Sequence, residues 1–236
     1  MAALASPLPP HKSVLLDACT SAGCLAFGTF TLKSGRVSPY FFNAGKLHSA
    51  TLLRCLSTAF AQTLATYEPA LDFDVLFGPA YKGIPLAAVV TEKLATVDDK
   101  RFGQVSYSFN RKEKKAYGDG GTLVGSELKG KRVVIVDDVM TAGTAIREAV
   151  DIIEREGGVL VAIIVALDRM EKMPPRDGED PDAPAPSAIG EVRARYGIPV
   201  LAVLTLDDIM KELKALGNDE DFKRMDDYRA KYRPVD

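Results

Sequence analysis

The sequence contains no tryptophan, only two histidines and only three cysteines. Cys19, Cys24 and Cys55 form no C-x-x-C pair and no metal-ligand spacing with a histidine, which argues against the common zinc motifs. An odd number of cysteines without a pairing pattern indicates free thiols in a reducing compartment. The longest apolar run, residues 159–167, is far too short to cross a bilayer, and the amino terminus lacks the pattern of a secretory signal. We therefore expect a cytoplasmic protein that does not enter a membrane.

The chain also lacks a strong charge of either sign. Its net charge of -2 provides no global field that would attract nucleic acid, so small anions must be bound by a local cluster of cations. Neither G-x-x-x-x-G-K-[ST] nor G-x-G-x-x-G occurs, which argues against an ordinary nucleotide triphosphatase or a dinucleotide enzyme. With 236 residues, 47% hydrophobic and 26% charged, we expect one globular domain over residues 1–236.

What the sequence does contain is a recurring strand, loop and helix, which predicts an α/β fold with buried, mostly parallel strands. Two stretches depart from this pattern. Residues 25–45 predict a hairpin with Lys33 and Arg36 as exposed charges near its tip. Residues 171–188 are rich in proline and acidic residues and predict a flexible loop. The strands are expected at 73–77, 104–109, 133–136, 159–167 and 199–205.

The most informative stretch is residues 131–146, KRVVIVDDVMTAGTAI. A buried strand is expected to end at Asp137 and Asp138, and a short turn leads into a helix predicted over 145–156. Unpaired N–H groups at the start of a helix attract a phosphate, and Gly143 lets an anion approach the backbone. The two carboxylates suit the hydroxyls of a ribose or a hydrated Mg²⁺. An acidic pair after a strand also occurs in receiver domains and Walker B segments, so the pair by itself leaves these alternatives open.

Three other segments carry charged or glycine-rich patterns, each with a simpler alternative. The loop Gly78 to Gly83 follows a strand and suits an anion, although it could be a plain connection. The basic segment 110–121, NRKEKKAYGDGG, suits a mobile lid over a leaving group, although a solvated hairpin tip has the same composition. Arg169 suits a two-pronged contact with a carboxylate, and a structural ion pair with Asp168 is an equal alternative.

Taken together, these segments resemble the orotate phosphoribosyltransferase family, of the type I phosphoribosyltransferases. FTLKSGRVSPYFFNAG, GPAYKGIPLA, FNRKEKKAYGDGG, VVIVDDVMTAGTA and ALDR stand in the order and spacing of that family. The resemblance implies a mostly parallel sheet flanked by helices, with a small hood and a flexible catalytic loop at about 110–121. It also implies transfer of the phosphoribosyl group from 5-phosphoribosyl 1-pyrophosphate (PRPP) to orotate in pyrimidine (UMP) biosynthesis, giving orotidine 5-monophosphate and pyrophosphate.

The resemblance assigns roles to individual residues. The catalytic ones are Lys112, Lys115, Asp137 and Asp138. PRPP would be bound by Lys33, Tyr81, Lys82, Arg111, Lys112, Lys115, Tyr117, Asp137, Asp138, Val139, Met140, Thr141, Ala142, Gly143, Thr144 and Ala145. Orotate would contact Lys33, Phe41, Phe42, Thr141 and Arg169. Mg²⁺ would be held mainly through PRPP and water, with Asp137 or Asp138 as a further ligand.

The resemblance also implies a homodimer, because the catalytic loop of relatives closes over the active site of the neighbouring subunit. Tyr117 departs from the family, in which many members carry histidine, and a phenol cannot exchange a proton near neutral pH as imidazole can. A purine phosphoribosyltransferase should lack the FTLKSGR and FNRKE elements. A PRPP sensor that binds nucleic acid should lack the lid lysines and carry a broad basic face.

Overall fold

A six-stranded sheet forms the centre of the molecule. The computed structural model describes residues 7–113, 122–140, 143–175, 178, 180 and 182–236. The strand order is β5-β4-β3-β6-β7-β8, and all neighbouring strands are parallel except β4 and β5. The predicted α/β class with a mostly parallel sheet is therefore confirmed. The strands are β3 (Val75–Gly78), β4 (Ser106–Asn110), β5 (Leu123–Gly125), β6 (Arg132–Val139), β7 (Val159–Asp168) and β8 (Val200–Thr205).

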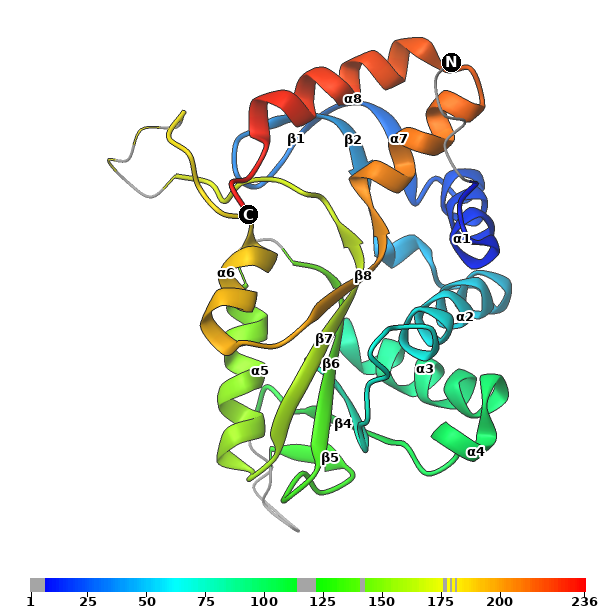
Figure 1. Ribbon diagram of the computed structural model, residues 1–236, viewed down its shortest axis with the longest axis vertical. Helices are drawn as coiled ribbons and strands as arrows, with labels where there is room; N and C mark the ends of the chain where they lie inside the picture. The colour runs from blue at the N-terminus through cyan, green and yellow to red at the C-terminus, as the bar shows by residue number, and fades with distance from the viewer. Residues whose placement is uncertain (1–6, 114–121, 141–142, 176–177, 179, 181) are drawn as a thin grey trace.

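Helices cover both faces of this sheet. In Figure 1 the sheet is seen almost edge-on, with α5 and α6 on one side and α2 and α3 on the other. The short helix α4 and the three-residue strand β5 were not predicted, because elements of this length show no periodicity. The helices are α1 (Pro10–Ser21), α2 (Ala50–Ala65), α3 (Gly83–Val97), α4 (Asp99–Phe102), α5 (Thr144–Arg155), α6 (Ala188–Tyr196), α7 (Leu206–Ala215) and α8 (Asp219–Tyr232), with a 3-10 turn at Ala44–Lys46.

The core consists of two apolar layers, one on each face of the sheet. Val134 and Val136 of β6 belong to the layer beneath α2 and α3, and Val133 and Ile135 belong to the layer beneath α5. Successive side chains of a strand point to opposite faces, so a strand buried on both sides reads as an unbroken apolar run. The run VVIV is therefore explained by its position in the middle of the sheet.

The side on which the chain adds successive strands reverses between β3 and β6. From β3 the chain passes to β4 on one side, and later returns to β6 on the other side of β3. The connections that leave the carboxyl ends of β3 and β6 therefore diverge to opposite sides. In open α/β sheets, ligands bind in the crevice at such a switch point. The fold thus places the loop at residues 79–82 beside the loop that follows β6.

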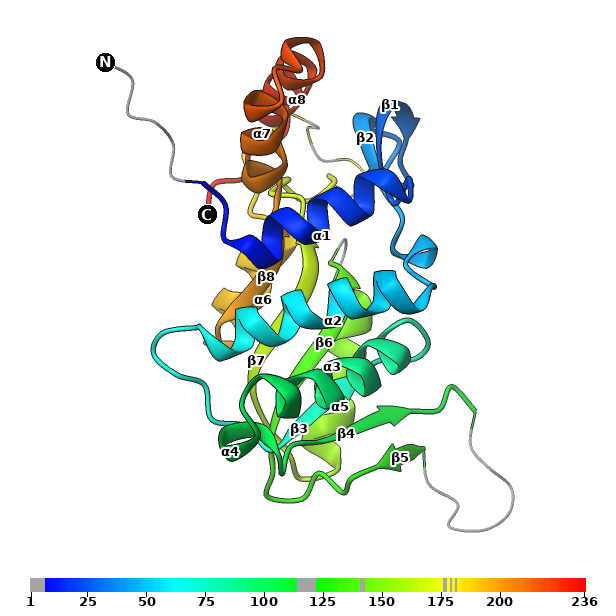
Figure 2. The ribbon, with the colours of Figure 1, turned by 90° about the vertical axis from the view of Figure 1, so that its right-hand side faces the viewer.

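A hairpin stands apart from the central sheet. It consists of β1 (Leu25–Thr31) and β2 (Val37–Phe42), paired antiparallel as predicted. Figures 1 and 2 both show the hairpin with α7 and α8 at the end of the molecule toward which the parallel strands run. Arg36 was expected among the exposed charges at the hairpin tip, but it is buried (8% exposed), because its guanidinium is enclosed by α8 and the segment after β7.

Candidate active site at the carboxyl ends of β3 and β6

The acidic pair lies within β6 and does not end it. The strand continues to Val139, which pairs with Leu167 of β7, so the prediction that Asp137 and Asp138 end the strand is wrong. The reason is that β7 extends to Asp168 and continues to offer backbone partners. Because side chains alternate along a strand, Asp138 points toward the α3 side and Asp137 toward the α5 side.

An ion pair joins the two predicted ligand loops. Lys82, the residue before α3, donates from Nζ to Oδ2 of Asp138 at 2.6 Å. The side chain of Lys82 is 70% exposed, whereas that of Asp138 is only 11% exposed. A solvent-accessible ammonium therefore stands over a mostly buried carboxylate at the switch point. An arriving phosphate can take up the outer donors of Lys82 while the pair stays intact.

The second carboxylate, Asp137, binds its proton more tightly than an ordinary aspartate. Burial, together with the neighbouring charge of Asp138, raises the pKa of Asp137 to about 6. Its Oδ1 accepts the backbone N–H of Asp138 at 2.9 Å. At neutral pH the side chain is mostly ionised but poorly hydrated. A desolvated carboxylate of this kind is suited to accept hydrogen bonds from ligand hydroxyls.

The loop between β3 and α3 depends on two glycines packed against each other. A Cβ on Gly78 would lie 2.1 Å from the carbonyl oxygen of Gly83, a distance that no side chain allows. The N–H of Ala80 donates to Oδ1 of Asn110 at 3.0 Å, which fixes the loop to the end of β4. The Ala80–Tyr81 peptide bond is cis, and the Tyr81 side chain is exposed. Sequence analysis did not single out Asn110, although its place at a strand's carboxyl end was a usable signal.

The loop after β6 leads into α5 through a glycine with positive φ. Gly143 has φ +67° and immediately precedes Thr144, the first residue of the helix. Thr144 and Ala145 are exposed, as a phosphate site requires, whereas Met140 is buried and Val139 partly buried. Thr141 and Ala142 lie outside the described residues.

Arg147 is a residue near this loop that sequence analysis missed. Its Nη2 donates to Oγ1 of Thr144 at 3.1 Å, and its Nη1 lies 3.9 Å from Oε2 of Glu191. Positions three apart on a helix share a face, so its position three residues after Thr144 was the available signal. Arg147 therefore adds positive charge beside the amino terminus of α5.

The basic segment begins close to the same helix. The backbone N–H of Arg111 donates to the carbonyl of Thr122 at 2.7 Å, which closes the base of the segment. Lys112 Nζ lies 3.7 Å from Oε2 of Glu148 on α5, and both side chains are exposed. Lys115 and Tyr117 lie outside the described residues.

Arg169 pairs with a different acid from the one considered in the sequence. Its Nη2 lies 2.7 Å from Oε1 of Glu171, whereas Asp168 accepts the backbone N–H of Met170. The suggested ion pair between Asp168 and Arg169 is therefore not the one formed. Burial raises the pKa of Asp168 above its ordinary value.

The aromatic residues predicted at the base site lie on opposite faces of β2. Phe41 is 39% exposed, with its ring centroid 5.6 Å from that of Phe30, whereas Phe42 is 9% exposed and packs in the core. Lys33 is exposed in the hairpin connection. Of the two phenylalanines, Phe41 thus offers the larger surface to a ligand.

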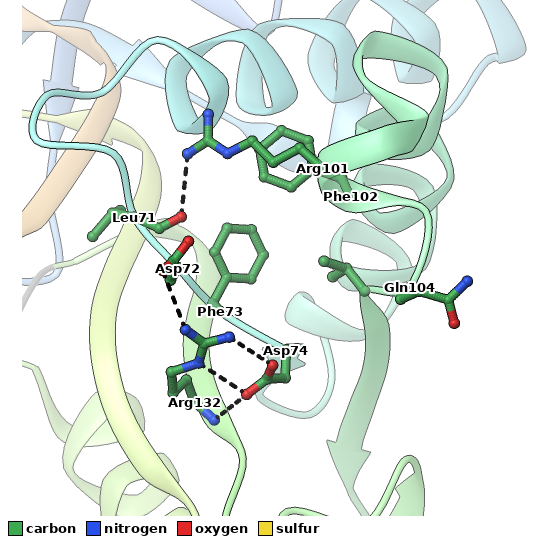
Figure 3. Close-up of a pocket in the computed structure, with 9 residues that line it drawn as sticks. Leu71, Asp72, Phe73, Asp74, Arg101, Phe102, Gln104 and Arg132 are labelled. Atoms are coloured by element: carbon green, nitrogen blue, oxygen red, sulfur yellow. Dashed lines mark hydrogen bonds and ion pairs between the residues drawn. The ribbon is translucent and has the colours of Figure 1, made fainter.

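A small cavity at the opposite end of the sheet is structural. It has a volume of about 160 Å³ and is lined by residues that include Phe73, Arg101 and Arg132, as Figure 3 shows. Arg132 binds Asp74 at 2.9 Å, and this hydrogen-bonded pairing lowers the pKa of Asp74 to about 2. Arg101 donates to the carbonyls of Ala65 and Leu71. These partners already occupy both guanidinium groups, and the cavity contains none of the predicted site residues.

The described part of the chain shows neither a cluster of metal ligands nor a membrane-spanning helix. No group of three or more His, Cys, Asp or Glu side chains there could hold a metal ion. None of the helices described is long and apolar enough to cross a membrane.

Comparison with known proteins decides the family. The phosphoribosyl transferase domain family matches residues 52–186. The chain is 54% identical over 231 residues to the orotate phosphoribosyltransferase of Neurospora crassa, covering 97% of this chain and 99% of that relative. It is 53% identical over 235 residues to that of Metarhizium anisopliae, covering 99% and 100%. The chain belongs to the orotate phosphoribosyltransferase family.

The solved structures agree with this membership. A crystal structure of orotate phosphoribosyltransferase from Francisella tularensis matches with a TM-score of 0.78 and 35% identity, covering 92% of this chain and 98% of that chain. The predicted phosphoribosyltransferase fold is thereby confirmed.

Proposed function

We infer that this chain is an orotate phosphoribosyltransferase, a glycosyltransferase of pyrimidine biosynthesis. It transfers the 5-phosphoribosyl group of PRPP to orotate and produces orotidine 5-monophosphate and pyrophosphate. The observation that carries this conclusion is the similarity to enzymes of that name over nearly the full length of the chain. The ion pair between Lys82 and Asp138 at the switch point supports it independently.

PRPP would lie across the two loops joined by that ion pair. Asp137 and Asp138 would accept hydrogen bonds from the ribose hydroxyls, and the loop from Val139 to Ala145 would bind the 5-phosphate at the start of α5. Positive φ at Gly143 and the exposure of Thr144 support this placement. The pyrophosphate would contact Lys33, Tyr81, Lys82, Arg111, Lys112, Lys115 and Tyr117.

In the reaction, the bond from the anomeric carbon to pyrophosphate breaks, a bond to a ring nitrogen of orotate forms, and the proton of that nitrogen passes to the leaving pyrophosphate or to solvent. The sugar passes through an oxocarbenium-like state, as in other glycosyl transfers. Because the sugar carbon is strongly electrophilic in this state, the ring nitrogen of orotate needs little activation. Catalysis therefore depends mainly on stabilising the leaving pyrophosphate with Lys82, Lys112 and Lys115, and on excluding water. Orotate itself would contact Lys33, Phe41, Phe42, Thr141 and Arg169.

The acidic pair also fits a magnesium ion, within limits. Two carboxylates are too few for a cage made of protein alone, and Asp138 already binds Lys82. Mg²⁺ commonly keeps several waters and binds through substrate phosphates plus one or two carboxylates. Asp137 or Asp138 would be such a ligand. The bound ion would neutralise charge on the pyrophosphate, while the lysines of this chain contact its outer oxygens.

Two further features of the family are proposed for this chain. We propose a homodimer in which the basic segment of one subunit reaches the active site of the other, supported by the exposure of Lys112. We propose a cytoplasmic location, supported by the three cysteines, all of which are free.

The experiment is a direct assay of the purified protein. Orotate absorbance is followed in the presence of PRPP and Mg²⁺, with parallel samples that each lack one component. Loss of the orotate band only in the complete mixture is expected. If uracil or hypoxanthine were consumed instead of orotate, the base assignment would be wrong and the fold assignment would remain. If PRPP bound without conversion of any base, a PRPP sensor would replace the enzyme.

A further inference from the structure

Three neighbours fix the guanidinium of Arg169. Its Nε donates to Oε1 of Glu171 at 2.8 Å, and its Nη2 lies 2.7 Å from the same oxygen and donates to Oγ of Ser38 at 3.2 Å. The ring of Tyr40 lies beneath the guanidinium, 4.4 Å from its central carbon. The side chains of Arg169 and Glu171 are only 11% and 12% exposed. The orientation of Arg169 is therefore set before any ligand arrives.

Glu171 also faces a second buried arginine. Nη1 of Arg36 lies 3.6 Å from Oε2 of Glu171, so each carboxylate oxygen faces a different guanidinium. Arg36 donates in addition to the carbonyls of Lys172 and Met173, at 2.7 and 3.0 Å. Two guanidinium groups thus share one carboxylate and leave an excess positive charge. Such an excess suits a ligand that brings its own negative charge.

The far side of this network is the end of α8. The guanidinium of Arg36 lies over the ring of Tyr232, 4.5 Å from its centroid, and the N–H of Lys172 donates to the carbonyl of Tyr232 at 2.8 Å. Figure 1 shows the carboxyl end of α8 close to the hairpin and to the segment that follows β7. The sequence gives no functional role to α8. The structure connects it to Arg169 through Arg36 and Glu171.

We propose that Glu171 is a positioning residue for the base: it aims Arg169 at orotate and is itself held by Arg36 and the end of α8. The proposal depends on the proposed contact between Arg169 and orotate. Its physical basis is preorganisation. A free arginine side chain loses much rotamer entropy when it binds, and a side chain that is already ordered does not lose it again.

The test is Glu171→Gln, which keeps the shape and one acceptor oxygen but removes the charge. We expect the KM for orotate to rise about tenfold, the usual scale for losing a charged hydrogen bond. The KM for PRPP and the kcat at saturation should stay within about twofold of the original values. The reason is that the substitution weakens only the binding of orotate, so it should change neither PRPP binding nor the rate of the saturated enzyme. Glu171→Asp, which restores the charge on a shorter side chain, should give a smaller rise.

Asp208→Asn is the matched control. Asp208 forms a comparably buried ion pair with Lys12 at 2.8 Å, between α7 and α1, and the substitution makes the same chemical change. It should lower the melting temperature without raising the KM for orotate relative to the KM for PRPP. If Glu171→Gln gave only this result, Glu171 would be merely structural. If Glu171→Gln lowered the KM for orotate, Glu171 would compete with the base for Arg169, and the proposal would fail.

Arg169→Ala separates this inference from the function on which it depends. It should raise the KM for orotate more than that for PRPP. If it did so and Glu171→Gln did not, only the positioning role would be wrong. If Arg169→Ala left the orotate KM unchanged, the base contact itself would be wrong, and with it the inference. If the unaltered protein did not consume orotate at all, the proposed function would fail first.

Discussion

At the residue scale, the charged groups of the site differ in their burial and in their charged partners. Asp137 and Asp138 are adjacent in sequence, yet one is desolvated on the α5 side and the other is paired with Lys82 on the α3 side. Sequence reasoning treated them as one acidic unit. The alternation of side chains along β6 gives them different neighbours and therefore different chemistry.

Asp137→Asn should stabilise the protein while reducing its activity. The raised pKa of about 6 means that the folded state binds this proton more tightly than the unfolded chain, whose value is near 3.8. The contribution of Asp137 to stability is therefore complete below about pH 4 and is lost as pH rises through 6. Relative to the original protein, the variant should gain about 2–3 kcal/mol in free energy of unfolding by pH 7.

Denaturant unfolding at several pH values between 4 and 8 measures this gain. Glu127→Gln changes an exposed carboxylate and should show no comparable rise. A gain that did not depend on pH would mean that the stabilisation has another origin than the titration of Asp137.

Lys82→Met should weaken catalysis and leave Asp138 without its partner. We expect kcat/KM for PRPP to fall on the order of 100-fold, as when one preorganised charge near a leaving group is removed. Lys93→Met is the matched control, because Lys93 lies on α3 and pairs with Glu92 at 3.7 Å, away from the acidic pair. Initial rates at varied PRPP concentrations provide the measurement, and equal effects of the two substitutions would contradict a specific role for Lys82.

At the element scale, the loops owe their form to backbone packing more than to their charges. Gly78 and Gly83 permit the end of β3 to touch the start of α3, and Asn110 ties the same loop to β4. The sequence predicted a glycine-flanked loop, but only the structure shows that the two glycines touch each other. The reason is that the contact between the two glycines depends on how the loop folds, which the order of residues along the chain does not reveal.

Gly78→Ala should damage both stability and PRPP binding. The new Cβ would meet backbone atoms of Gly83, which cannot move aside without shifting α3. We expect a loss of about 2–4 kcal/mol in free energy of unfolding and a higher KM for PRPP.

Thermal and denaturant unfolding, together with PRPP kinetics, provide the readout. Gly28→Ala is the control, since its Cβ would meet only the end of the Phe30 side chain at 3.2 Å, which can rotate. Similar losses in both variants would show that the glycine contact in the loop is not special.

At the scale of the whole molecule, the proposed homodimer concerns the subunit in which the basic segment acts. Lys82, Asp138 and the start of α5 face the switch point, whereas Lys112 lies beside Glu148 on the surface of α5. In the proposed homodimer, a second copy of the chain would contribute the cations of its basic segment to this site.

Mixing two inactive variants tests this arrangement. Lys112→Ala and Asp138→Asn subunits should each be nearly inactive alone. If the basic segment acts across the dimer, random exchange should restore about a quarter of the original activity, because about half of the dimers are mixed and each has one intact site. Activity is measured after the mixed subunits have exchanged. No gain over the separate variants would place the segment over its own subunit's site.

The sequence by itself determined the fold class, the order of the strands and helices apart from α4 and β5, and the motif set that places the chain among the orotate phosphoribosyltransferases. These features are local, because strand runs, helix periodicity and loop motifs are each written in consecutive residues. Only the tertiary structure decided that Arg36 is buried and that Arg169 pairs with Glu171 instead of Asp168. It also decided that α8 contacts Arg36 through Tyr232, and that Arg36 in turn faces Glu171. Residue 36, residue 171 and residue 232 become neighbours only when the hairpin, the end of β7 and the last helix pack together, and no local pattern encodes that contact.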